Sequence, residues 1–111
     1  MARHSVPVTP DTFTREHEFE ADEIGVHLMA RAGFNPGKAI QLMEREAMEE
    51  EEYLAELQEK AKRGDVDAAK IIESAYITHP PTRQRVERLR QHLPAAMKAY
   101  RDYQQRTATG A

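Results

Sequence analysis

Two carboxylates near the start of the chain, Glu18 and Asp22, are predicted to lie on the inward face of an amphipathic helix. If residues 11–32 are helical, each residue turns by about 100°, so Asp22 lies one turn beyond Glu18 on the same side. Burying a carboxylate is costly unless a cation, a hydrogen-bond donor or a metal ion meets it. The pair therefore requires a partner of one of these kinds. The apolar arc around it is predicted to contain Phe19, Ala21, Gly25, Val26, Leu28 and Met29.

The other charged residues of this segment are predicted to point away from the pair, into solvent. They are Glu16, Glu20 and Glu23, together with His27. The spacing of the pair also has a simpler interpretation, because a Glu and an Asp four residues apart are often surface charges or partners of the helix dipole. His17 is adjacent to Glu18, and adjacent helical residues do not face one another, so we expect a boundary or core histidine there.

The composition favours packed amphipathic helices. The chain has 111 residues, no Trp, no Cys and 32% charged residues. A chain of this length forms one small domain or part of a larger one, since single domains commonly contain about 100 to 150 residues. The lack of cysteine excludes disulfides, thiol catalysis and cysteine metal sites. No apolar run approaches the length of a membrane span, about 18 residues, and residues 1–9 lack the apolar stretch of a signal peptide, so we expect a soluble chain.

The charges are nearly balanced overall but unevenly distributed. A net charge of −3 does not indicate attraction to nucleic acid or to an anionic membrane. Acids concentrate in residues 44–52, and a later basic segment could complement them. That segment contains Arg83, Arg85, Arg88 and Arg90.

Proline, glycine and capping residues divide the chain into about five predicted helices. The first runs from about Pro10 to Gly33, and Asn35 with Pro36 begins the second. Residues 49–63 and 65–76 are predicted to form a helical hairpin, a basic helix begins near Thr82, and Pro94 opens the last helix. We see no alternating strand pattern, so the predicted fold is all-α. A helical unit over residues 10–106 is expected between a flexible start, 1–9, and a flexible tail, 107–111.

Two sequence blocks resemble a known enzyme family. Residues 15–25, continuing to Pro36, resemble the "SRxxExEADxxG…AGFxP" segment of the zinc metallopeptidases that include HtpX, BepA and the CAAX prenyl endopeptidases. Residues 78–86 resemble the "THPxxxxRI" segment of the same family. The blocks occur in the family's order and together span some 35 residues, although residues 49–77 make a longer insertion than many members carry.

The resemblance implies a role for four residues. Glu18 would be the third ligand of a catalytic zinc ion, because family members use two His and one Glu. Asp22 would orient a ligating His by accepting its free N–H. His79 would approach the metal or the substrate carbonyl, and Arg85 would pair with the acids. Simpler roles are a loop or helix-start histidine for His79 and a solvated base for Arg85.

The sequence lacks the "HExxH" helix that provides the other two ligands and the general base in this family. No two of its five histidines have the i, i+4 spacing, and His17-Glu18-Phe19-Glu20-Ala21 ends in alanine. Family members carry this helix upstream, where the chain has only residues 1–14. We therefore expect the carboxy-terminal part of a metallopeptidase domain that cannot hydrolyse peptides unaided.

Other functions remain open at this point. The same helices would also suit a non-catalytic module that binds a polypeptide or a partner subunit. A plain helical adaptor or a weak nucleic-acid binder is a third hypothesis, but the basic helix has no base-reading motif and no aromatic platform, so we expect no nucleic-acid partner. For the peptidase fragment, the expected partners are a polypeptide substrate and an HExxH-bearing segment or subunit. The resemblance suggests a bacterial envelope or membrane-associated location, and the oligomeric state is open.

Overall fold

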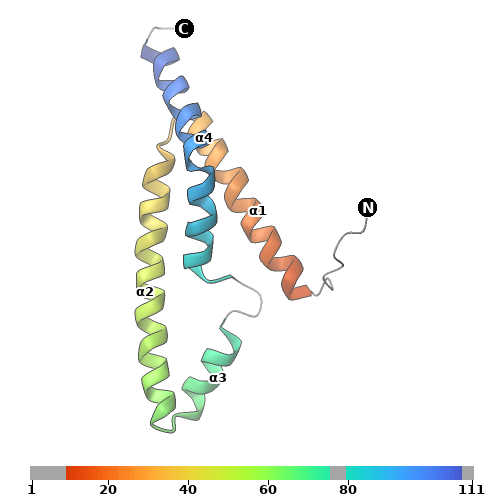
Figure 1. Ribbon diagram of the computed structural model, residues 1–111, viewed down its shortest axis with the longest axis vertical. Helices are drawn as coiled ribbons and strands as arrows, with labels where there is room; N and C mark the ends of the chain where they lie inside the picture. The colour runs from red at the N-terminus through yellow and green to blue at the C-terminus, as the bar shows by residue number, and fades with distance from the viewer. Residues whose placement is uncertain (1–9, 76–79, 109–111) are drawn as a thin grey trace.

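The computed structural model describes residues 10–75 and 80–108, with side chains from residue 14 onward. Within these ranges the chain forms four helices and no strand, so the predicted all-α class is confirmed (Figure 1). The helices are α1 (Pro10–Arg31), α2 (Pro36–Lys62), α3 (Val66–Ser74) and α4 (Thr82–Ala108).

The structure has four helices where about five were predicted, because two predicted breaks, one near residue 48 and one at Pro94, are absent. Pro94 lies inside α4 with its side chain exposed. Proline removes one backbone hydrogen bond and crowds the preceding turn. The helix continues because it is packed on both sides of the proline, with Leu89 and Ala96 both buried. The first arm of the predicted hairpin is the second half of α2, which runs without interruption through residues 47–49.

Helix α4 is the central element. It packs against both α1 and α2, while α3 packs on α2 and on no other described helix. Helices α1 and α4 run in the same direction, and α2 runs the opposite way (Figure 1). The molecule is flat, with extents of 64 × 41 × 16 Å. A flat arrangement leaves large apolar side chains on the surface, among them Ile24, Leu28, Phe34, Leu42, Met48 and Tyr53.

The core is thin and lies along α4. Each of its buried residues comes from one of the three long helices, with α4 contributing half of them. They are Val26, Ala30, Ile40, Val86, Leu89 and Ala96. Small and medium side chains make up this core, so the helices approach closely but bury little apolar area. The charged contacts between helices therefore carry much of the specificity of their packing.

The predicted helix ends are confirmed at both glycine turns. Gly33 has φ 91°, and the amides of Gly33 and Phe34 donate to the carbonyls of Ala30 (3.1 Å) and Met29 (2.9 Å), which closes the end of α1. Gly64 closes α2 in the same way with φ 95°. Asn35 then caps α2 by accepting from the Gly37 amide at 2.9 Å. Asp65 caps α3 by accepting from the Ala68 amide at 3.1 Å.

The two glycines differ in what surrounds them. A Cβ at Gly33 would overlap the ring of Tyr103, whereas a Cβ at Gly64 would meet nothing within 4 Å. The aromatic ring near the end of α4 therefore lies directly against the turn between α1 and α2.

This difference predicts unequal effects of the same substitution. Gly64→Ala pays only for the left-handed backbone, about 1 kcal/mol. Gly33→Ala carries the same penalty and must also displace Tyr103, which adds about 1 to 3 kcal/mol. Urea unfolding of the chain followed by circular dichroism measures both values. Equal losses in the two variants would show that Tyr103 does not pack against this turn.

Candidate functional site

An ion pair joins Asp22 of α1 to Arg85 of α4. Arg85 Nε donates to Asp22 Oδ2 at 2.9 Å, and Arg85 Nη2 donates to Asp22 Oδ1 at 2.8 Å. The side chain of Asp22 is 14% exposed and that of Arg85 is 30% exposed. Two parallel hydrogen bonds of this kind fix the orientation of both groups. The pairing of Arg85 with an inward acid of the first helix, predicted from the sequence, is present.

Glu18 lies one turn before Asp22 on α1 and is half-buried. The hydrogen bond to Asp22 is the main reason that the pKa of Arg85 is raised above its usual value, while burial acts in the opposite direction. The negative charges of Asp22, Glu18 and Glu46 of α2 also raise the pKa of Arg85. These four residues, Glu18, Asp22, Glu46 and Arg85, form what we call the Arg85 cluster. Asp22 contacts the guanidinium of Arg85, whereas Glu18 and Glu46 act on it through their charges.

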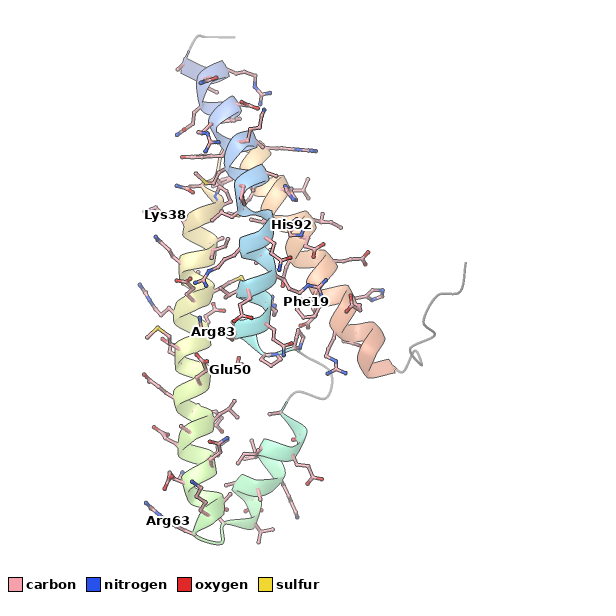
Figure 2. The ribbon with its side chains drawn as sticks, viewed as in Figure 1. Phe19, Lys38, Glu50, Arg63, Arg83 and His92 are labelled. Carbon is pink, nitrogen blue, oxygen red and sulfur yellow. The ribbon has the colours of Figure 1, made fainter. Side chains whose placement is uncertain are left out.

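A second arginine of α4 also binds α1. The guanidinium carbon of Arg88 lies 4.0 Å from the centre of the Phe19 ring, an arrangement in which the cation is attracted to the aromatic face. Figure 2 shows Phe19 between α1 and α4. Arg88 also lies 3.6 Å from Glu16 and 3.7 Å from Glu23. These contacts cover Phe19, which is only 7% exposed.

The predicted complementarity between the acidic and basic segments is confirmed between α2 and α4. Arg83 Nη2 donates to Glu51 Oε1 at 2.8 Å, and this hydrogen bond lowers the pKa of Glu51. Arg90, about two turns further along α4, pairs with Glu44 of α2. Arg85 and Arg88 instead turn to α1, so the basic residues of α4 are divided between its two neighbours.

Glu50 anchors the first residue of α4, and nothing in the sequence distinguishes it from the other acids in its run of four. Its carboxylate accepts from the Thr82 amide at 3.1 Å and from the Thr82 hydroxyl at 2.7 Å. Figure 2 shows Glu50 on α2 beside the start of α4. Free amides at a helix start need acceptors, and here a neighbouring helix supplies one.

The predicted orientation of α1 needs correction for both its apolar face and its polar face. The buried side chains are Phe19, Val26 and Ala30, so this helix packs on α4 through a narrower face than expected. Glu23 and His27, predicted to be solvated, are partly buried and face α4. The predicted apolar arc of α1 is too wide, because it combines the face that packs on α4 with a second apolar face that no described residue covers. This second face contains Ala21, Ile24, Gly25 and Leu28, all exposed.

Glu23 and His27 belong to a second polar cluster that sequence reasoning missed. His27 Nε2 lies 3.3 Å from His92 Nδ1, and His92 Nε2 lies 3.4 Å from Glu23 Oε1. The two rings meet edge to face, with centres 5.4 Å apart. A pocket of about 370 Å³ lies beside them, lined also by Ile24, Leu28 and Arg31. The two histidines are 65 residues apart, so no local spacing could have identified the pair.

The predicted site residues are thus only partly assembled in the described structure. Asp22 and Arg85 are in contact, Glu18 acts on Arg85 through its charge, and His79 lies outside the described residues. Over residues 14–75 and 80–108, no three His, Cys, Asp or Glu side chains form a group that could hold a metal ion. No helix of the described part of the chain is both long and apolar enough to cross a membrane.

The Asp22–Arg85 pair is expected to stabilise the contact between α1 and α4. Asp22→Asn leaves the guanidinium without its carboxylate, and we expect a loss of about 1 to 2 kcal/mol in the free energy of unfolding, because Arg85 is partly exposed and solvent offsets some of the cost. Glu51→Gln is the matched control at the more exposed pair with Arg83 and should cost less. Urea unfolding measures both, and an Asp22→Asn variant as stable as the parent chain would contradict a stabilising role.

Comparison with known proteins identifies the family of this chain. The family model of peptidase family M48 matches residues 4–93. The chain is 32% identical over 87 residues to the mitochondrial metalloendopeptidase OMA1 of Saccharomyces cerevisiae. This match covers 78% of the chain and 22% of the yeast protein, so the chain spans about a fifth of the length of that relative. No solved structure matches the chain. Because the family model covers most of its residues, the chain belongs to peptidase family M48, a family of zinc metallopeptidases.

Proposed function

We propose that this chain contributes one zinc ligand, Glu18, and the surrounding Arg85 cluster to a metalloendopeptidase that hydrolyses polypeptides. The two other ligands and the general base would come from an HExxH segment, since none of the five histidines of this sequence has that spacing. The observation that carries the proposal is the half-buried carboxylate of Glu18, one turn from a fixed Asp22–Arg85 pair.

The chemistry of these residues fits a zinc site. A carboxylate oxygen is a common ligand of catalytic zinc alongside two imidazoles, and the ion, when bound, supplies a Lewis acid for peptide hydrolysis. Arg85 would hold Asp22 in one orientation, and Asp22 would accept the N–H of a ligating imidazole, which fixes the tautomer of that ring. His79 would act next to the metal or the substrate carbonyl, as the family resemblance implies.

The exposed face of α1 supports this proposal because it leaves room for another helix. It is defined by Ala21, Ile24, Gly25 and Leu28, and a Cβ added to Gly25 would meet nothing within 4 Å. A glycine inside a helix costs about 1 kcal/mol relative to alanine, and no packing within the described chain requires it. A second backbone passing close to Gly25 would require it. By helical rotation Gly25 lies within about 20° of Glu18, so such a helix would pass next to the proposed ligand.

The same face also supports the alternative function, a non-catalytic module that docks on a partner through α1. Zinc separates the two hypotheses, because only the peptidase needs Glu18 to bind metal. The substrate class, a polypeptide, follows from the family, and the yeast relative is mitochondrial by name. Association with an envelope or membrane stays a prediction of the family resemblance.

A chimera tests the peptidase role of Glu18. The matched region of the yeast metalloendopeptidase is replaced by this chain, and zinc content and hydrolysis of an unfolded protein such as casein are measured. Glu18→Gln should remove activity and lower zinc content, because one of three ligands is weakened. Glu20→Gln is the matched control, since this exposed residue is only two positions away and should leave both unchanged. Full zinc content and activity in the Glu18→Gln chimera would remove this residue from the ligand set.

Gly25 provides a separate test of the docking face. In the chain alone, Gly25→Ala should raise the free energy of unfolding by about 0.5 to 1 kcal/mol, because it only improves helix propensity. In the chimera, Gly25→Leu should lower both zinc content and activity, since the larger side chain keeps the incoming helix away. Ala55→Leu, which also places a larger apolar side chain at an exposed helical position, in α2, serves as the control. An active Gly25→Leu chimera would show that no helix packs there.

A further inference from the structure

The cluster of Glu23, His27 and His92 lies on the other side of α1 from the proposed zinc ligand. His27 is nine residues beyond Glu18, and nine residues on a helix correspond to a rotation of about 180°. Figure 2 shows His92 on the side of α4 that faces α1. The cluster is therefore separate from the Arg85 cluster, and the proposed peptidase function uses neither histidine, although Ile24 and Leu28 of the exposed face of α1 also line the pocket beside them.

We propose that His27 and His92 form a second metal site, which binds one divalent transition-metal ion such as Zn²⁺ or Cu²⁺. The spacing of their nitrogens carries the proposal. His27 Nε2 and His92 Nδ1 are 3.3 Å apart and share a hydrogen bond, whose proton is released when an ion takes its place. Two imidazole nitrogens that each lie about 2.0 to 2.1 Å from a tetrahedral ion are separated by about 3.3 to 3.4 Å. The two rings thus already have the separation that a shared ion requires.

Glu23 prepares His92 for this role. Its carboxylate oxygen lies 3.4 Å from His92 Nε2, which favours a proton on that nitrogen. The lone pair of His92 is then on Nδ1, the nitrogen nearest to His27. Carboxylates orient ligating histidines in this way in many metal sites, and they also make the imidazole nitrogen a more basic ligand for the metal.

The surroundings determine how strongly an ion binds. The open pocket of about 370 Å³ beside the two rings has room for water molecules that complete the coordination. Arg31 lines the pocket, and Arg88 lies 3.7 Å from Glu23, so two positive charges oppose a cation. With two protein ligands and this repulsion, the site binds weakly and follows the usual order for imidazole ligands, with Cu²⁺ ahead of Zn²⁺. A bound ion would link α1 to α4, since each helix provides one ligand.

Thermal unfolding of the chain with CuCl₂ or ZnCl₂ tests the site. An ion that binds only the folded state raises the melting temperature as its concentration increases. We expect such a rise in the parent chain and its loss in His27→Gln and in His92→Gln. Glu23→Gln should weaken binding by about tenfold, because the carboxylate no longer holds His92. His17→Gln, which changes a histidine elsewhere on α1, should retain the full rise.

Spectra and a further variant complete the test. Nitrogen NMR of the imidazoles should show metal-dependent shifts at His27 Nε2 and His92 Nδ1 in the parent chain, which does not depend on any variant folding. Glu18→Gln should keep the rise in melting temperature, so failure of the proposed peptidase ligand and failure of this site are distinguishable. A hydrogen bond between the two histidines only, with no rise in melting temperature and no shifts at millimolar metal, would overturn the proposal. A rise that survives both histidine substitutions would overturn it as well.

Discussion

Arg85 donates two hydrogen bonds to Asp22, and this contact determines how α1 lies on α4. The helices bury mainly small and medium side chains, so apolar packing alone would allow them to slide past one another. Directional pairs between charged groups prevent this. Helix α4 carries the cations, and it contacts acids on both neighbours: Arg85 and Arg88 bind α1, whereas Arg83 and Arg90 bind α2. The fold is therefore organised by one basic helix between two acidic ones.

The sequence predicted the features that depend on local chemistry. Capping by Asn35 and Asp65, the glycine turns and the pairing of the acidic and basic segments are all confirmed, because each follows from residue types at short spacing. The prediction that Pro94 begins a new helix was wrong, because packing on either side of it keeps α4 continuous. The inward direction of Asp22 was predicted correctly, but the buried face of α1 is narrower than predicted. The periodicity of apolar residues cannot distinguish a helix face that packs within the chain from an apolar face that the chain leaves exposed.

The candidate site shows the same limit. The motif resemblance predicted Glu18, Asp22 and Arg85 as site residues from their types and order, and the structure shows the contact between Asp22 and Arg85. The roles of Glu50 and of the His27–His92 contact depend on which helices lie side by side, and this is a property of the tertiary structure. An ordinary run of acids and two distant histidines give no local signal for such contacts. The chain belongs to peptidase family M48, and the side of α1 opposite Glu18 has its own polar chemistry.

The close approach of Tyr103 to Gly33 links two positions that are 70 residues apart in the sequence. The aromatic ring occupies the space that any side chain at position 33 would need, and the left-handed backbone already favours glycine there. During evolution these two positions are thus constrained to change together. A relative that has lost the glycine should carry a smaller residue at the position of Tyr103. Covariation of this kind would indicate that the last part of α4 packs against the turn between α1 and α2.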